Sequence, residues 1–338
     1  MNQPEYGFDE ASRGADLLRE KIREHGMNPE AVKDGVILGS GLGNFAKDHL
    51  EGDKSGEVSG PVALSYDDIY KALGKPVGEG KVEGHDKKVI IAQLQGTDAE
   101  RLVVALSGRE HPYEGVDGRR ATFLLRVMQL LGVKTLFGSN AAGIITPDTI
   151  TPPALVLTHS NEDLAISVDS PLIGPNDERF GPRFPHMIDI YPAETRAIVK
   201  KVAEDLEIAL GEGTYIRFKG PNYESPEEIS RAVEMLENMW TRGRKRKGED
   251  RFQGQPVGVV GMSSTYEARV AQHAVQSKTY PAFQDGRAFV SVATNYAGSV
   301  GPDGFVEPSS HTEVQENAAI VQERFGRLAR EAILRMRK

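Results

Sequence analysis

The chain has 338 residues, 39% of them hydrophobic, which is enough to form one large core or two smaller ones. Its net charge of −8 and pI of about 5.6 exclude a general attraction to nucleic acid or to an anionic membrane, so local groups must hold any bound anion. The absence of cysteine excludes disulfides, thiolate metal sites and a cysteine nucleophile. With no run of signal-peptide or membrane-spanning length, we expect a cytoplasmic protein without a membrane or nucleic-acid partner.

Helical and strand-like segments alternate along most of the chain. A helix is predicted over residues 9–25, ending at Gly26, and Asn28-Pro29 looks like a second helix start. Apolar runs predict strands at 36–38, 89–92, 102–106, 134–138, 154–158, 214–218, 256–260 and 288–293. Helical periodicity covers 119–131, 192–210, 226–240, 265–276 and 310–336, with capping boxes at Ser225/Glu228 and Ser310/Glu313.

This alternation predicts the fold class: α/β, a single-domain sandwich over residues 1–338, with a central mixed, largely buried β-sheet flanked by helices. Residues 44–80 carry only a weak pattern and are expected to be irregular. A basic cluster lies within 240–255, between a predicted helix and a predicted strand. Because acidic residues follow it directly, it is better explained as a solvated surface insertion than as a nucleic-acid patch.

Six polar segments lie at or near the ends of apolar, strand-like runs. They are Gly39–Gly43, Gly108–Gly115, Ser139–Gly143, Gly220–Glu224, Met262-Ser263 and Thr294–Tyr296. Ligands of α/β sheets bind outside the carboxyl ends of strands, so these segments could converge on one pocket. Their glycines, hydroxyls, Arg, His, carboxylate and amide suit an anion beside a neutral polar heterocycle.

The individual motifs leave several functions open. Gly41–Ala46 matches a loose dinucleotide fingerprint, but no second strand ending in an acid follows it, so a phosphate-binding glycine loop or a plain turn fits equally well. The sequence lacks the motifs of P-loop nucleotidases, serine hydrolases and zinc peptidases, and His159, Glu162 and Asp163 lack metal-ligand spacing. We therefore expect no metal site.

Two pairs of residues carry the remaining chemistry. Arg109 and His111 follow a buried strand and could bind phosphate oxygens. The alternative is a surface ion pair, but the neighbouring Gly108, Gly115 and Tyr113 favour a site. Glu224 and Asn295 could together bind the edge of a purine, because a carboxylate accepts and a carboxamide both donates and accepts. Singly, each is more often a turn or cap residue.

The ordered set of motifs resembles one family, the trimeric purine nucleoside phosphorylases with the related methylthioadenosine phosphorylases. The resemblance runs from about Asp9 to the last helix. It rests on the six segments above and on the run Gly174–Phe180. It implies a homotrimer that uses no metal or organic cofactor and takes inorganic phosphate as a co-substrate.

Each functional position is carried over from the family's motifs. The resemblance implies that phosphate is bound by Ser40, His85, Arg109, His111, Ala141 and Ser263, and purine by Glu224, Asn295 and Tyr223. It implies that ribose contacts Tyr113, Met262, His311 and, from a neighbouring subunit, Phe184. Asn295, His111 and Glu224 would carry catalysis, with Asn295 stabilising charge that develops on the departing base.

The sequence departs from the family pattern in a few places. Tyr223 stands where Phe is usual, Tyr296 replaces a Lys of animal members, and Ile144-Ile145 replaces a common Gly-Leu. The implied reaction is reversible phosphorolysis of 6-oxopurine (deoxy)ribonucleosides, such as inosine and guanosine, in purine salvage. The alternatives are a methylthioadenosine phosphorylase, which typically has Asp in place of Asn295, a dinucleotide-binding oxidoreductase, and a non-catalytic nucleoside-binding protein.

Overall fold

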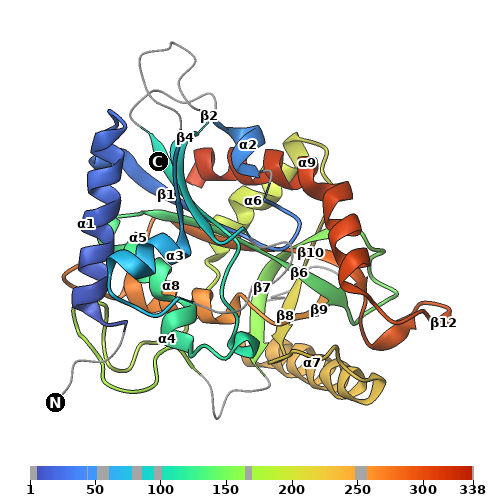
Figure 1. Cartoon of the computed structure of the whole chain (residues 1–338). Coiled ribbons are helices and arrows are strands. Elements are labelled where there is room, and N and C mark those ends of the chain that lie inside the picture. The colour runs from blue at the N-terminus through green and yellow to red at the C-terminus, as the bar shows by residue number, and fades with distance from the viewer. Residues whose placement is uncertain are drawn as a thin grey trace.

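The computed structural model describes residues 6–43, 45–51, 61–77, 86–94, 101–163, 170–247 and 257–336, with the backbone alone at 47, 51 and 241–247. Its centre is a ten-stranded mixed sheet in the order β10-β7-β8-β9-β6-β1-β5-β4-β2, with β3 paired to β4 (Figure 1). The strands are β1 Val32–Leu38, β2 Leu50–Glu51, β3 Val62–Ser65, β4 Lys88–Leu94, β5 Leu102–Ser107, β6 Thr135–Ile144, β7 Ala154–Asp163, β8 Leu210–Arg217, β9 Val257–Gly261 and β10 Gly286–Tyr296. A separate small pair joins β11 (Val300–Gly301) to β12 (Gly304–Phe305).

Strand β10 pairs with β6 as well as with β7, so five strands form a closed ring in the order β10-β7-β8-β9-β6. The β10–β6 pairing is parallel and extends from Gly286↔Thr135 to Tyr296↔Ile144. By contrast, β6 and β9 are antiparallel and meet only at Gly143↔Val260 and Ile144↔Val259. The carboxyl ends of two oppositely running strands therefore come together at one place.

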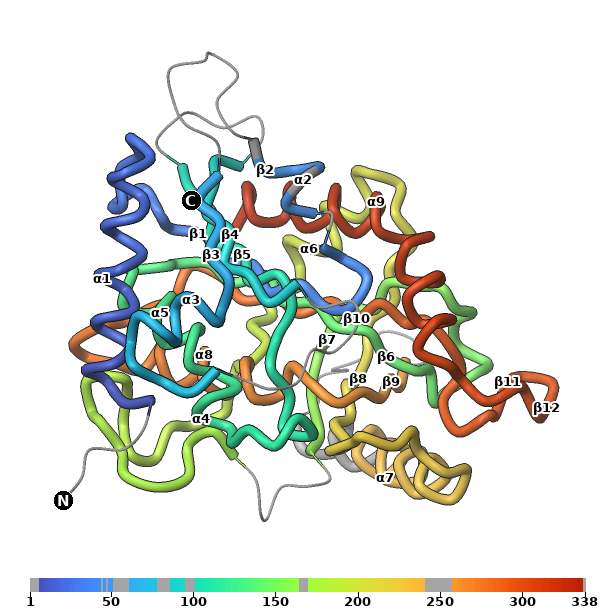
Figure 2. The backbone as a smooth tube through the Cα atoms, in the orientation of Figure 1, coloured from blue at the N-terminus to red at the C-terminus, as the bar shows by residue number. Residues whose placement is uncertain are grey.

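Helices pack on both faces of the sheet, as the tube view also shows (Figure 2). The apolar cluster on one face includes α1 (Phe8–Glu24), α5 (Phe123–Leu131) and α8 (Thr265–Val275). The cluster on the other includes α2 (Phe45–His49), α6 (Ala193–Asp205) and α9 (His311–Met336). Ile37 of β1 belongs to the first cluster and its neighbours Val36 and Leu38 belong to the second, so this strand is buried on both faces.

The remaining helical elements border the carboxyl ends of the strands or connect the layers. Helix α7 (Pro226–Lys247) packs Ile229, Ala232 and Leu236 against Ile216 of β8 and Val260 of β9. The shorter elements are α3 (Tyr66–Ala72), α4 (Gly118–Ala121) and the 3₁₀ turns η1 (Pro29–Ala31), η2 (Pro112–Glu114) and η3 (Ala297–Ser299). Among the described residues, no helix is both long and apolar enough to cross a membrane.

The predicted fold class is confirmed, as are most of the predicted helices and strands. The prediction that 44–80 is irregular is wrong in part, since it contains α2, β2, β3 and α3, with the side chain of Ser65 accepting from the amide of Asp68 to start α3. The second predicted helix start is only the turn η1. Helix α7 continues to Lys247, so the basic segment begins as helix, while its residues 248–255 lie outside the described part.

Candidate active site

A cavity of about 310 Å³ opens where the carboxyl ends of β1, β5, β6, β9 and β10 meet the segment after β8. Its lining includes eleven of the thirteen side chains and backbone positions that the sequence predicted for the site. They are Ser40, Arg109, His111, Tyr113, Ala141, Tyr223, Glu224, Met262, Ser263, Asn295 and His311. Of the other two, His85 lies outside the described residues, and Phe184 is 88% exposed and does not line this cavity.

Arg109 follows β5 directly and is held in one orientation by buried partners. Its Nε donates to Glu267 Oε1 at 2.8 Å, and its Nη2 donates to the backbone carbonyl of Ser139 at 2.6 Å. Its Nη1 reaches Ser263 Oγ at 3.4 Å. The guanidinium is thus held in place by an ion pair, and both Arg109 and Ser263 line the cavity.

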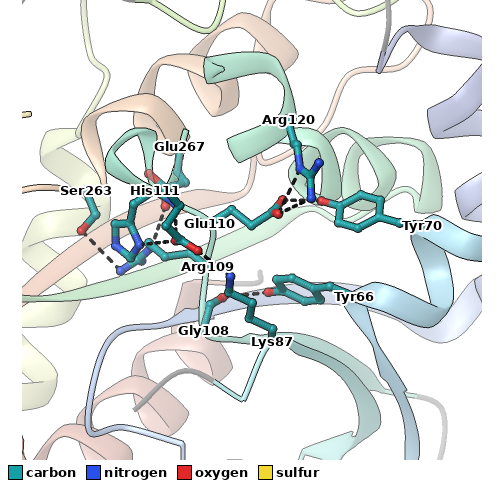
Figure 3. A network of polar contacts seen from close by, with 11 residues as sticks. Tyr66, Tyr70, Lys87, Gly108, Arg109, Glu110, His111, Arg120, Ser263 and Glu267 are labelled. Atoms are coloured by element: carbon teal, nitrogen blue, oxygen red, sulfur yellow. Dashed lines mark hydrogen bonds and ion pairs between the residues drawn. The ribbon is translucent and has the colours of Figure 1, made fainter. Parts of the chain in front are cut away.

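The turn that carries Arg109 is held by a second set of polar contacts, which involve its neighbours Gly108 and Glu110 (Figure 3). The hydroxyl of Tyr66 donates to the carbonyl of Gly108 at 2.7 Å. The carboxylate of Glu110 accepts from the hydroxyl of Tyr70 at 2.7 Å and from Arg120 at 2.9 and 3.0 Å. These contacts pair the buried Glu110 charge and leave Arg109, on the opposite side of the turn, to face the cavity.

His111 is oriented by Glu114, which lies one turn further along the chain. Its Nδ1 donates to Glu114 Oε1 at 3.2 Å, its backbone N–H donates to the same oxygen at 2.8 Å, and Lys87 donates to Oε2 at 2.6 Å. Burial alone would raise the pKa of Glu114, but hydrogen bonds from His111 and Lys87 outweigh it and lower the pKa to about 2. Burial lowers the pKa of His111, so near neutral pH the ring is uncharged and Nε2 carries a lone pair.

The glycine loop after β1 lies directly against β6 and α9. A Cβ on Gly39 would stand 2.7 Å from Asn140 Cα, and one on Gly41, whose φ is +77°, would stand 2.6 Å from Ala318 Cβ. Only glycine fits at either position. This close packing brings the neighbouring Ser40 to the wall of the cavity.

The Met262–Ser264 turn is pinned by two neighbouring strands. The amide of Ser263 donates to the hydroxyl of Tyr215 on β8 at 3.0 Å, and the side chain of Asn140 on β6 donates to Ser264 Oγ at 2.8 Å. Ser264 has a φ of +64°, which is unusual for a residue other than glycine. Strain of this kind persists where surrounding contacts hold it, and here the two hydrogen bonds keep Ser263 beside Arg109.

Glu224 and Tyr223 form a less constrained wall, between β8 and α7. Burial raises the pKa of Glu224. Within the described part of the chain, no cation or side-chain donor is bonded to its carboxylate, although the residue is only 9% exposed. Tyr223 is 46% exposed. Just beyond them, Ser225 and Glu228 form the predicted capping box that starts α7.

Asn295 is the second-last residue of strand β10, and both its amide oxygen and its amide nitrogen form hydrogen bonds. The hydroxyl of Thr294 donates to Asn295 Oδ1 at 2.9 Å. Asn295 Nδ2 donates to Ser309 Oγ at 2.6 Å and to the carbonyl of Tyr296 at 3.2 Å. On α9, Asn317 donates to the carbonyl of Thr294 at 2.7 Å, which ties this end of the strand to the helix.

Sequence reasoning missed the residues that orient the site. Glu267, Glu114 and Ser309 hold Arg109, His111 and Asn295 respectively. Glu114 and Glu267 lie inside or beside motifs that the sequence made conspicuous, but nothing in their spacing shows which side chain each would contact. Ser309 precedes a predicted helix cap and carries no signal of its own.

The dinucleotide-binding interpretation of Gly41–Ala46 is wrong. Strand β1 lies between β5 and β6, so the helix after the loop, α2, does not lead to a neighbouring parallel strand. It leads instead to β2, which pairs with β4 at one edge of the sheet. The βαβ unit that such a fingerprint requires is absent from this part of the described chain.

Comparison with known proteins agrees with this geometry. The pattern of the Phosphorylase superfamily matches residues 66–334. Purine nucleoside phosphorylase 1 of Bacillus subtilis (strain 168) is 32% identical over 322 residues, covering 95% of this chain and 97% of the relative. Purine nucleoside phosphorylase of Rattus norvegicus is 33% identical over 274 residues, covering 80% and 78%.

Solved structures show the same relationship. Schistosoma mansoni purine nucleoside phosphorylase in complex with adenosine has a TM-score of 0.74 and 26% identity, covering 98% of this chain and 99% of that one. The same enzyme in complex with inosine has a TM-score of 0.74 and 25% identity, covering 97% and 96%. The chain therefore belongs to the purine nucleoside phosphorylase family within the phosphorylase superfamily.

Proposed function

We propose that this chain catalyses the reversible phosphorolysis of 6-oxopurine nucleosides such as inosine and guanosine, giving the free base and ribose 1-phosphate. The observation that carries the proposal is the cavity itself, where a fixed guanidinium and hydroxyl face a buried carboxylate and a carboxamide. A related purine nucleoside phosphorylase structure holds ribose 1-phosphate and has a TM-score of 0.68 with 26% identity. The two chemical ends of the cavity match the two parts of such a substrate pair.

The phosphate end is formed by Ser40, Arg109, His111, Ser263 and the backbone of Ala141, with His85 assigned here on sequence alone. Arg109 supplies the charge, since Glu267 and Ser139 fix its direction. Nε2 of the neutral His111 can accept a hydrogen bond from a protonated phosphate oxygen. Phosphate held here acts as the nucleophile at the anomeric carbon and balances the positive charge that grows on the sugar.

The base end is formed by Glu224, Asn295 and Tyr223. A carboxylate at Glu224 accepts from the N–H edge of the purine, and Asn295 bonds the O6/N7 edge, where negative charge grows as the glycosidic bond breaks. Tyr223 lies beside the base plane, and Tyr113, Met262 and His311 contact the ribose. The carboxamide at position 295, rather than a carboxylate, favours this assignment over methylthioadenosine phosphorylase.

We also propose that the active unit is a homotrimer in the cytoplasm in which Phe184 completes a neighbour's site. Its support is the segment that carries Phe184, which is irregular and yet firmly anchored. Gln272 and His273 of helix α8, and Gln276 directly after it, donate to backbone carbonyls of this segment, and Arg119 of α4 donates to another. Phe184 and Ile188 are nevertheless exposed. Large apolar side chains on a fixed, exposed loop suit contact with another subunit.

The test is an assay of hypoxanthine released from inosine with and without phosphate, and with a metal chelator. We expect cleavage that requires phosphate and survives the chelator, because neither the phosphate end nor the base end depends on a metal in this mechanism. Full activity without phosphate would contradict phosphorolysis. Activity lost to the chelator and restored by added Zn²⁺ would contradict the prediction that no cofactor is needed. Absence of any turnover, with nucleoside bound, would favour a non-catalytic binding protein.

A further inference from the structure

The hydrogen-bonding capacity of the Asn295 amide is largely used within the protein. A carboxamide has two N–H groups to donate and an oxygen with two lone pairs. One N–H goes to Ser309 Oγ at 2.6 Å and the other to the carbonyl of Tyr296 at 3.2 Å. The oxygen accepts one hydrogen bond, from Thr294. Among the described contacts of this amide, both N–H groups are therefore engaged, and one lone pair is left over.

The orientation of the amide follows from its surroundings. The backbone carbonyl of Tyr296 can only accept, so the amide atom facing it must be the nitrogen. If the amide were turned over, its oxygen would face that carbonyl oxygen and the hydrogen bond from Nδ2 to Tyr296 would be lost. Ser309 and Thr294 are compatible with the observed orientation, because a hydroxyl can either accept or donate.

What remains on Asn295 resembles what a carboxylate would offer at this position. A 6-amino purine presents an N–H donor, which the remaining lone pair can accept at once. A 6-oxo purine presents an acceptor, so an N–H of Asn295 must first leave Ser309 or Tyr296 to reach it. Unlike a carboxylate, a carboxamide can donate to a 6-oxo group, and the internal partners of Asn295 oppose that donation.

We propose that Ser309 sets the balance between 6-oxo and 6-amino purine nucleosides by competing with the substrate for an N–H of Asn295, an inference that rests on the proposed function. Ser309 does not line the cavity, so it acts through Asn295 and is a positioning residue. The residue lies in the segment between β12 and α9, where sequence patterns gave no functional signal.

The test compares kcat/KM for inosine and adenosine, at saturating phosphate, in the wild type and in Ser309→Ala. Removing the hydroxyl frees one N–H of Asn295 to face the base. We expect the ratio of inosine to adenosine to rise roughly three- to tenfold, the range expected for one net hydrogen bond. Ser309→Thr retains a hydroxyl and is expected to keep the wild-type ratio.

Two further variants separate specificity from folding. Ser310 is adjacent, and its hydroxyl instead accepts from the amide of Glu313 at the start of α9. Ser310→Ala is therefore expected to lower the melting temperature without moving the substrate ratio. In an Asn295→Asp background there is no N–H to free, so adding Ser309→Ala should leave the ratio where Asn295→Asp alone puts it.

The outcomes distinguish this inference from the function on which it rests. A ratio that stays constant or falls in Ser309→Ala, or an equal loss on both substrates, overturns the competition and leaves phosphorolysis in place. A ratio that rises as much in the Asn295→Asp background also overturns it, because the effect would not pass through the amide. If the wild type shows no phosphate-dependent cleavage of either nucleoside, the proposed function fails and this inference fails with it.

Discussion

The two ends of the cavity are organised in opposite ways. At the phosphate end, Arg109 and His111 each have a carboxylate partner, Glu267 and Glu114, that fixes their direction before any ligand arrives. At the base end, the carboxylate of Glu224 is buried with no cation bonded to it in the described part of the chain. The phosphate end is thus preorganised for an anion, while the carboxylate at the base end accepts from its own backbone amide and has no cation partner among the described residues.

This contrast indicates where each kind of specificity arises. Phosphate is small and symmetrical, so a fixed cation and fixed hydroxyls are enough to bind it. A purine is recognised by the pattern of donors and acceptors on its edges, and a site with an unpaired buried acceptor penalises a base that lacks the matching donor. Substitutions at the two ends should therefore fail in different ways.

The largest effect is expected at the phosphate end. Arg109→Gln removes the fixed cation and leaves Glu267 buried without its partner, so we expect kcat/KM for phosphate to fall about a thousandfold. The double variant Arg109→Gln/Glu267→Gln removes the stranded carboxylate as well. It should regain thermal stability without regaining phosphate binding. An unchanged KM for phosphate in the single variant would show that Arg109 does not bind it.

A smaller effect, confined to the base, is expected at Glu224. Glu224→Gln replaces a charged acceptor with a neutral amide, so kcat/KM for inosine should fall about 10- to 100-fold, in line with one hydrogen bond to a charged group. The KM for phosphate should stay within error, because the ligands at that end are untouched. Glu228→Gln, which weakens the cap of α7 and leaves the Glu224 carboxylate in place, is the matched control. Equal losses on phosphate and inosine would contradict the division of the cavity.

The role of Asn295 in recognising the base is tested directly by the selectivity between inosine and adenosine. Asn295→Asp cannot donate to O6, and an unpaired buried acceptor costs about 1–3 kcal/mol, or roughly one to two decades in relative rate. We expect turnover of inosine and guanosine to fall and preference to move toward adenosine. The measurement is kcat/KM for inosine and adenosine in both proteins. If the ratio of the two does not change, Asn295 does not contact the base edge.

The parts of this site that could be predicted are those that appear as local patterns in the sequence. An apolar run followed by a polar tail marks a strand and its carboxyl end, so the positions of Arg109, Ala141 and Asn295 around one pocket could be expected. The predicted strand at 134–138 is too short, because Ser139–Gly143 forms the second half of β6. Its small residues are buried against β10, a contact between segments about 150 positions apart.

The rest depends on such distant contacts and could not be derived locally. The pairing of β10 with β6, which closes five strands on one another, has no signature in either strand alone. The same holds for Glu267, which lies 158 positions from Arg109, and for Ser309. The supporting residues of a site are chosen by geometry after folding, whereas its ligand-facing residues tend to lie in conspicuous loops.

A moderate effect is expected from Phe184, which lies outside both ends of its own cavity. Phe184→Ala should reduce kcat/KM for inosine about tenfold, which corresponds to the burial of one aromatic side chain. Co-refolding these subunits with inactive Glu224→Ala subunits tests the shared site. Activity should rise above the sum of the separate proteins, since some mixed assemblies contain an intact composite site. No gain in any mixture would show that each subunit supplies its own Phe184.

The smallest expected effect is on the pH dependence of kcat/KM, which should again distinguish the two ends of the cavity. Burial raises the pKa of Glu224 above its usual 4.5, so this carboxylate takes up a proton at a higher pH than an exposed one does. Only the ionised form accepts from the purine, so kcat/KM for inosine should decline as the pH falls through that raised pKa. Glu114, with a pKa of about 2, stays ionised over the same interval. At saturating phosphate, the decline should therefore be present in the wild type and absent in Glu224→Gln. An acid limb that persists unchanged in Glu224→Gln would assign it to another group and remove the buried carboxylate from the recognition of the base.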